Sequence, residues 1–246
     1  MNYYLLTISY DGSELHGWAK QNNLLTAQGE LEKSFVAIFK SNLFHTLGAS
    51  KTDAGVHARN QKVFLQTEFR FNHRLIARDI NSRINKNIFV KSIVEISPDF
   101  LVRNCKQKTY RYYLSTNEYD PLKRRYYHFL KFEFNKFKFE ESLKLFVGLH
   151  DFRNFSGLKK NEYDNYNLER KIDHINIISE DDNNHYIEFK AKGFLRYQIR
   201  KIIGTCIAYN NNTITLEDIK KSLSINGEKM KFIADPSGLL LYDIIY

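Results

Sequence analysis

A loop of small and polar residues carries the aspartate around which chemistry can be built. Asp53 lies in the stretch Gly48–Ala58, between a short apolar run and a strand-like one. The glycines at positions 48 and 55 allow backbone conformations that bulky residues resist. A carboxylate held on a loop between two strands is a common way to build a catalytic or binding site. The alternative is a polar turn in which Asp53 caps its own backbone.

An arginine inside an apolar helix is the second candidate. Arg200 precedes Ile202 and Ile203, whose spacing indicates the buried face of a helix over 198–208. A buried guanidinium needs an anionic partner, because an unpaired buried charge is costly. The alternative is a boundary residue whose charged head reaches water. The nearby Arg196 is more easily explained as facing solvent or phosphate.

Basic and aromatic residues are interleaved in two stretches, 106–113 and 123–127. This pattern suits RNA, because cations meet the phosphates and exposed bases stack on aromatic rings. The alternative is a tyrosine-rich strand with one buried and one solvated face. Tyr110 begins the strand-like part of the first stretch, with Lys108 and Arg111 beside it and Arg103 upstream.

Patterns typical of metal and nucleotide sites do not occur. Asp53 and His57 are four residues apart, but Gly55 lies between them and argues against the helix that would align them. The sequence contains no His-Glu-x-x-His, Cys-x-x-Cys, Walker-type or Gly-x-Gly-x-x-Gly motif. We therefore expect no metal and no nucleotide cofactor. We interpret His150 and Asp151 as residues that fix a turn after a helix rather than as a catalytic pair.

The composition is that of a folded, basic protein. The 246 residues are 43% hydrophobic and 26% charged, and the net charge of +9 favours a polyanionic partner such as nucleic acid, although compositional bias is an alternative. No apolar run is long enough to cross a bilayer, and the N-terminus lacks the features of a signal peptide. The two cysteines, Cys105 and Cys206, lie far apart, which excludes a disulfide scaffold and suits a reducing cytoplasm.

Hydrophobic periodicity predicts two rounds of strands and helices. The first round is strand–helix–strand–strand–helix–strand, the order of a ferredoxin-like half. Its expected strands are at 3–10, 44–47, 62–67 and 88–96, with one helix after Thr26 that continues to residue 39 and another at 72–84. After Pro98 the second round has expected strands at 110–114, 126–134, 171–178, 185–192 and 239–245, and helices at 139–147, 198–208 and 216–223.

These elements predict an α+β fold of two ferredoxin-like (RRM-like) halves. Residues 1–102 form the N-terminal half with the Asp53 loop, and residues 103–246 form the C-terminal half with insertions. We expect the antiparallel sheets to join edge to edge, with helices behind them and a central basic cleft in front.

Taken together, the motifs resemble the TruA family of tRNA pseudouridine synthases. The matches run in order over nearly the whole chain. They are Tyr10-Asp11-Gly12-Ser13 with Gly17-Trp18 and Gln21, Thr52-Asp53-Ala54-Gly55-Val56-His57-Ala58, Phe100 to Arg103 with Tyr110-Arg111-Tyr112, His150-Asp151-Phe152 with Phe155, Phe194 with Ile199-Arg200 and Gly204, and Gly238-Leu239 with Leu241.

The resemblance implies a role for each central residue. Asp53 is the catalytic aspartate, Arg200 pairs with its carboxylate, and Tyr110 stacks on the target uracil and helps to move the C5 proton. Leu239 lines the pocket. The resemblance also implies a cofactor-free homodimer that acts on the anticodon stem-loop of tRNA, at tRNA positions 38–40. The basic residues that we predict to bind this substrate are Lys51, Arg103, Lys108, Arg111 and Arg196.

The implied chemistry agrees with these residue types. Conversion of uridine to pseudouridine breaks the N1–C1′ bond and joins C5 to C1′, with no redox step and no net hydrolysis. An ionised carboxylate attacks the sugar, attacks the base or takes a ribose proton, and the sequence does not choose among these. An arginine partner keeps the carboxylate ionised, and an aromatic ring holds a base flipped out of its stack.

The sequence departs from the family pattern at three places. Ser50-Lys51 stands where the family has Gly-Arg, and lysine keeps the charge but not the planar fork. Leu101-Val102 replaces His-Ala, and Arg196-Tyr197-Gln198 replaces His-His-Met. Asp53, Tyr110 and Arg200 are all present, so we expect an active enzyme. The alternative function is a non-catalytic RNA-binding module or a tRNA folding chaperone, which would not need an aspartate in a basic cleft.

Overall fold

The computed structural model describes residues 1–246, which form two compact units. The first unit contains Met1–Lys106 and Leu240–Tyr246, and the second contains Gln107–Leu239. These units are not the two predicted halves, because the boundary follows Lys106 and the end of the chain returns to the first unit. The return is made by a strand whose partner lies in that unit: Leu240 pairs with His57.

The first unit is a complete ferredoxin-like half. In chain order its elements are β1 (Asn2–Tyr10), α1 (Ala27–Phe39), β2 (Phe44–Gly48), β3 (His57–Thr67), α2 (His73–Asn81) and β4 (Ile88–Glu95). The sheet order is β4-β1-β3, with β2 on the other edge of β3, and all these pairs are antiparallel. The last strand of the chain, β10 (Leu239–Ile245), runs parallel to the start of β3.

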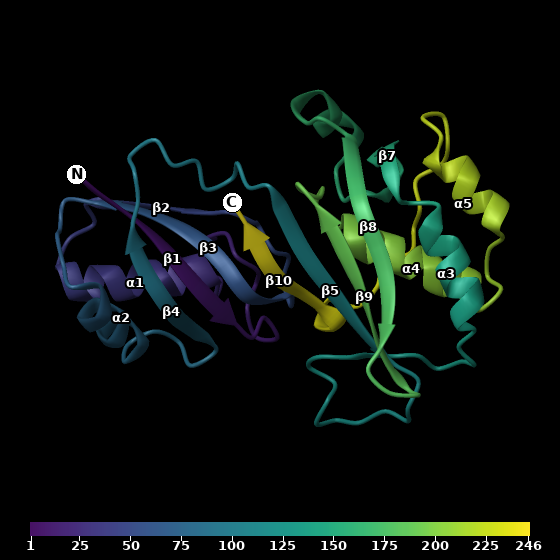
Figure 1. Ribbon diagram of the computed structural model, residues 1–246, viewed down its shortest axis with the longest axis horizontal. Helices are drawn as coiled ribbons and strands as arrows, with labels where there is room; N and C mark the ends of the chain where they lie inside the picture. Colours follow the sequence, from purple (N-terminus) through teal and green to yellow (C-terminus); the bar gives the residue numbers. More distant parts are fainter. The chain divides into compact units, whose positions relative to one another are not determined.

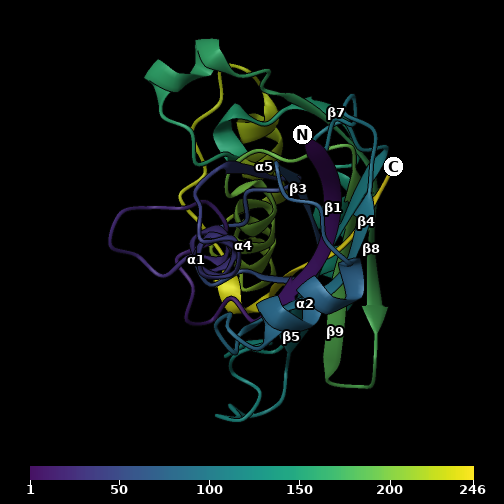
Figure 2. The same ribbon diagram turned by 90° about the vertical axis from the view of Figure 1, so that its left-hand side faces the viewer.

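Alternation along β1 decides where the core of this unit lies. Tyr4, Leu6 and Ile8 are fully buried, while the residues between them are only partly covered. The buried face is covered by α1 and α2, as Figures 1 and 2 show. The hydroxyl of Thr26 accepts a hydrogen bond from Gly29 N at 3.2 Å, so the predicted start of α1 is confirmed.

The second unit also has an antiparallel sheet with helices on one side. Its strand order is β5-β9-β8-β7, with the short β6 parallel to β5. Its elements are β5 (Gln107–Ser115), β6 (His128–Phe129), α3 (Lys136–Lys144), β7 (Gly148–Asp151), β8 (Glu169–Ser179), β9 (Asn184–Ala191), α4 (Gln198–Asn210), α5 (Leu216–Leu223) and the 3-10 helices η1 (Arg153–Phe155), η2 (Lys160–Asn165) and η3 (Pro236–Gly238).

The helices α3, α4 and α5 lie behind this second sheet in Figure 1. Tyr112 of β5 and Phe189 of β9 are fully buried, as are Phe139 of α3 and Ile202 and Ile203 of α4. The predicted α+β class is therefore confirmed within each unit. The edge-to-edge arrangement and the central basic cleft stay predictions.

No helix is both long and apolar enough to span a membrane.

One predicted strand is wrong. The expected strand at 126–134 is reduced to β6, which has two residues. The aromatic side chains of this stretch are packed by ring contacts instead of a strand ladder: Tyr127 meets Tyr113, and Phe134 meets Phe139. Aromatic residues favour strands because they fit a half-buried surface, and an irregular segment offers the same burial here.

Two helices and one turn also differ from the sequence predictions. The helix expected at 72–84 spans 73–81, because Asn72 is its N-cap, and the one expected at 139–147 spans 136–144. His150 and Asp151 lie on strand β7 rather than in a turn. They are not a pair: Asp151 binds Arg153 at 2.6 Å. Burial raises the pKa of Asp151, but the hydrogen bonds from Arg153 outweigh it and hold that pKa below its usual value.

Candidate active site

The loop between β2 and β3 holds Asp53 on a tight turn. Val56 N donates to the backbone carbonyl of Asp53 at 3.2 Å, which closes the turn. The preceding residue is fixed twice: Thr52 Oγ1 lies 2.7 Å from the hydroxyl of Tyr10, and Thr52 O accepts from Trp18 N at 3.1 Å. Thr52 is buried while the Asp53 side chain is partly exposed, so a rigid support presents a carboxylate at the surface of this unit.

The segment after β1 packs directly on this loop, and glycines make the close approach possible. A Cβ at Gly12 would lie 2.1 Å from the carbonyl oxygen of Val56. A Cβ at Gly17, whose φ is +88°, would lie 2.6 Å from the carbonyl oxygen of Thr52. Neither position accepts a side chain without moving the loop, so the predicted opening motif is part of the support of the Asp53 turn.

His57 is a buried residue at the junction of these segments that the sequence analysis did not select. It begins β3 and is 4% exposed. Its Nδ1 atom accepts a hydrogen bond from Gly12 N at 3.0 Å and lies 3.2 Å from Asp11 Oδ1. The contact joins residues 45 positions apart, which no local pattern reveals.

In the second unit, Tyr110 lies in the middle of β5 opposite Phe189 of β9. It is 8% exposed, and its ring meets that of Phe194 edge to face at 5.4 Å and 85°. Such an aromatic contact fixes a ring without blocking both of its faces. Leu239, the predicted pocket residue, is buried immediately after η3.

Arg200 lies in the first turn of α4 and is partly buried. Its Nε donates to the carbonyl oxygen of Ala234 at 2.9 Å, and its guanidinium carbon lies 5.3 Å from the ring centre of Tyr197. Burial raises the pKa of Asp235, but hydrogen bonds from Ser237 and the charges nearby, that of Arg200 among them, bring this pKa below its usual value. The guanidinium is thus held by backbone and ring contacts and creates a positive field around it.

The residue before α4 has an unusual backbone. Tyr197 is its N-cap and has φ 62°, a left-handed conformation that bulky residues rarely adopt. A Cβ at Gly157 would lie 2.4 Å from the Tyr197 ring, so the ring fills the space that a glycine leaves. Strain of this kind persists only where surrounding contacts enforce it.

The predicted substrate-binding cations fall into two groups. Lys51 and Arg103 of the first unit are exposed, and Lys108 of the second is partly exposed. Arg111 and Arg196 are engaged in ion pairs within the second unit. Arg111 Nε lies 3.0 Å from a carboxylate oxygen of Glu188, and its guanidinium lies over the Tyr186 ring. Arg196 Nη2 lies 3.0 Å from a carboxylate oxygen of Glu162.

The three predicted catalytic residues are divided between the units. Asp53 belongs to the first, and Tyr110 and Arg200 belong to the second. Within the second unit, Tyr110 and Arg200 are both held by aromatic rings of the segment that leads into α4, Phe194 and Tyr197. The predicted pairing of Arg200 with Asp53 stays a prediction.

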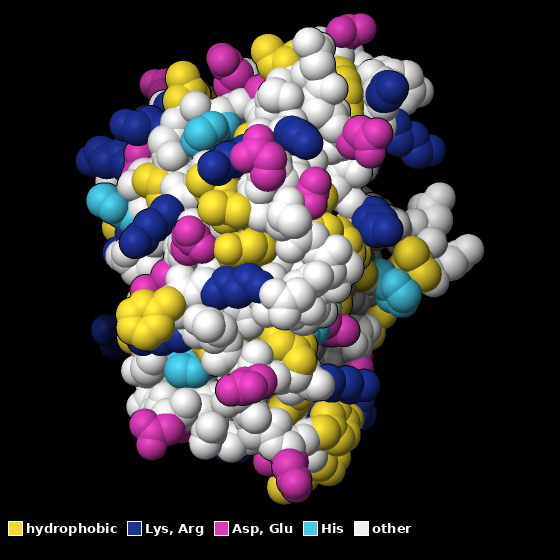
Figure 3. Space-filling model, turned by 90° about the vertical axis from the view of Figure 1, so that its right-hand side faces the viewer, with side chains coloured by type: hydrophobic (Ala, Val, Ile, Leu, Met, Phe, Trp, Pro, Cys, Tyr) yellow, Lys and Arg dark blue, Asp and Glu magenta, His cyan; other side chains and the backbone are white.

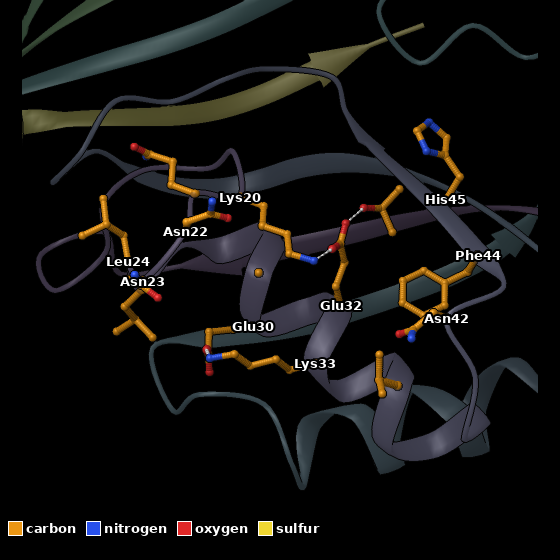
Figure 4. Close-up of a pocket in the computed structure, with 15 residues that line it drawn as sticks. Lys20, Asn22, Asn23, Leu24, Glu30, Glu32, Lys33, Asn42, Phe44 and His45 are labelled. Carbon is orange, nitrogen blue, oxygen red and sulfur yellow. Dashed lines mark hydrogen bonds and ion pairs between the residues drawn. The ribbon is translucent and has the colours of Figure 1, made fainter.

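A groove of ≈ 1070 Å³ lies elsewhere on the first unit, between α1, the loop before it and β2 (Figure 4). Glu32 is central to it and binds Lys20 at 2.8 Å and Thr46 at 2.6 Å. A second ion pair, between Lys33 and Glu30 at 2.6 Å, lies along the same helix. None of the predicted site residues lines this groove.

The chain is similar in sequence to known tRNA pseudouridine synthases. Residues 143–246 match the family model described as tRNA pseudouridine synthase. Three relatives, each called tRNA pseudouridine synthase A, match over nearly their full lengths. The protein of Mesoplasma florum is 39% identical (99% of this chain, 98% of the relative), that of Mycoplasma capricolum subsp. capricolum 40% (98% and 97%), and that of Thermosipho melanesiensis 34% (100% and 100%). The chain belongs to the tRNA pseudouridine synthase A (TruA) family.

Proposed function

We propose that this pseudouridine synthase acts on uridines in the anticodon stem-loop of tRNA and that Asp53 is its catalyst. Membership of the family makes the chain an isomerase of the tRNA pseudouridine synthase class. The observation that supports Asp53 in particular is the construction of its turn. Thr52 and Val56, on either side of Asp53, are buried and packed against β1 and the segment after it, while Asp53 is partly exposed.

The reaction needs a carboxylate and does not need an external reactant. The bond between N1 and C1′ of the uridine breaks, the base turns, and a bond forms between C5 and C1′. C5 gives up its proton and N1 gains one, so atoms and electrons balance. Attack on the sugar, attack on the base and removal of a ribose proton all require Asp53 to be ionised.

The other two residues of the proposed catalytic set serve this carboxylate and the base. Arg200 would pair with Asp53 and keep it ionised in a closed pocket. Tyr110 would stack on the uracil and help to move the C5 proton, with Leu239 lining the pocket. The way Phe194 holds the Tyr110 ring supports the stacking role, because a fixed ring loses little freedom when a base stacks on it.

We propose that Lys51, Arg103 and Lys108 contact the phosphates of the tRNA. All three are exposed or partly exposed. Arg111 and Arg196 would join them by exchanging their carboxylate partners for phosphates, because a guanidinium forks equally well onto either group. A cytoplasmic location would suit a tRNA substrate and the free thiols of Cys105 and Cys206.

We also propose that the enzyme is a homodimer. A row of apolar side chains crosses the face of the first sheet that α1 and α2 do not cover: Val94 pairs with Leu5, Leu5 with Phe64, and Phe64 with Leu47. A second copy that buried this row would remove apolar surface from water. Sedimentation of the wild type and of Phe64→Lys tests this, and a monomeric wild type would contradict it.

Release of tritium from tRNA labelled at C5 of uridine tests the catalytic proposal directly. We expect the wild type to release tritium and Asp53→Asn to release none, while both bind tRNA with similar affinity. Asp79→Asn, which changes a carboxylate of the same unit on α2, is the matched control and should remain active. Turnover by pure Asp53→Asn would refute the role of Asp53. A wild type that binds tRNA and releases no tritium would favour the RNA-binding alternative.

A further inference from the structure

We infer that His57 is a positioning residue for the Asp53 turn and that it does so through the hydrogen-bond acceptor at Nδ1. The inference rests on the proposed role of Asp53 and adds a residue with no assigned part in the reaction. His57 lies at the first position of β3, four residues after Asp53, and is 4% exposed.

The first step is the contact between His57 and the segment after β1. Gly12 N donates to Nδ1 at 3.0 Å, and both groups are buried. A ring nitrogen that accepts a hydrogen bond carries its lone pair there, so the ring proton is on the opposite nitrogen, Nε2. A buried backbone N–H without an acceptor is costly, so the position of Gly12 depends on the Nδ1 lone pair.

The second step is the contact between Gly12 and the turn. Gly12 lies so close to the loop that a Cβ would stand 2.1 Å from the Val56 carbonyl oxygen and 2.5 Å from its carbon. Val56 N in turn donates to the carbonyl oxygen of Asp53 at 3.2 Å. A shift of Gly12 is therefore passed to Val56 and from there to the turn that carries the carboxylate.

The third step is the carboxylate beside the same atom. Asp11 Oδ1 accepts hydrogen bonds from Ser13 N at 2.9 Å and Ser13 Oγ at 2.6 Å. Its 3.2 Å approach to Nδ1 is not a hydrogen bond in this tautomer, because both atoms are then acceptors. Asp11 thus fixes the turn that contains Gly12 from the other side. Nδ1 is the point at which β3, the Asp11–Ser13 turn and the Asp53 loop are brought into register.

Two nearly isosteric substitutions separate the acceptor from the bulk of the ring. In His57→Asn, Oδ1 stands where Nδ1 stood and can accept from Gly12. In His57→Leu, a methyl group takes that place and cannot accept. We expect the single-turnover rate of His57→Leu to fall by ~10- to 100-fold with tRNA affinity nearly unchanged, because a small misplacement of a reacting group has effects of that size. We expect His57→Asn to recover most of that loss.

Hydrogen exchange gives a second readout that does not depend on activity. In His57→Leu the amides of 11–18 and 49–56 should exchange on the order of tenfold faster, and in His57→Asn they should stay protected. His174→Leu, a change of an exposed histidine on β8, is the matched control and should alter neither readout.

The outcomes distinguish the two proposals. Equal rates for His57→Asn and His57→Leu, or wild-type exchange and rate in His57→Leu, would overturn the role of the Nδ1 acceptor. An inactive wild type would contradict the proposed function. In that case the exchange measurement still decides whether His57 positions the loop.

Discussion

At the scale of single residues, Tyr110 combines a ring and a hydroxyl whose roles can be separated. Tyr110→Phe keeps the edge-to-face contact with Phe194 and removes only the hydroxyl. We expect tRNA affinity near that of the wild type and a single-turnover rate lower by at least ~10-fold, because a positioned proton-transfer group contributes that much or more. A wild-type rate would leave Tyr110 with a stacking role alone, and Tyr110→Leu, which also removes the ring, shows how large that role is.

Lys51 tests whether a departure from the family pattern keeps a function. Its side chain is exposed two residues before Asp53, so simple solvation predicts an effect within ~0.5 kcal/mol for Lys51→Ala. We expect instead a fall in single-turnover rate of at least ~10-fold, equivalent to ~1.4 kcal/mol in the barrier. Lys51→Arg should retain or raise the rate, since a guanidinium adds a planar fork. Lys86→Ala, another exposed lysine of this unit, controls for charge, and equal rates for both alanine variants would make Lys51 a solvated charge only.

At the scale of elements, the end of α1 contains a residue poorly suited to its backbone. Lys40 is the C-cap, with φ 54° and an exposed side chain, and its N–H donates to Val36 O. Glycine adopts this left-handed conformation without the strain that a side chain brings. Relief of roughly 1–2 kcal/mol of left-handed strain outweighs the roughly 0.5–1 kcal/mol that the chain entropy of glycine costs, so we expect Lys40→Gly to raise the free energy of unfolding by up to about 1 kcal/mol in denaturant melts. Lys40→Ala keeps the Cβ and should give no such gain; equal gains in both variants would contradict the backbone explanation.

The elements also show how far a sequence can predict this structure. The order of the first half and the Thr26 cap were predictable, because periodicity and capping are local properties. The strand expected at 126–134 was not excluded by any local rule, since aromatic residues of this stretch are partly covered through ring contacts with partners such as Tyr113 and Phe139. The Asp53 loop could be selected by its residue types. The support given by His57 and Gly12 could not, because it joins residues 45 positions apart.

At the scale of the whole molecule, the net charge of +9 predicts a binding energy for tRNA that depends on salt. One face, over the second unit, carries basic and acidic side chains intermixed, so the excess charge does not form one patch there (Figure 3). Each phosphate contact releases counterions, and we expect tRNA affinity to weaken by at least ~10-fold between ~50 mM and ~200 mM salt. Arg103→Ala should lower the slope of log Kd against log salt by about 1 if Arg103 contacts one phosphate. Lys171→Ala, an exposed lysine of β8 beside Asp173, should leave the slope unchanged. A flat salt profile for the wild type would contradict a binding surface built from Lys51, Arg103 and Lys108.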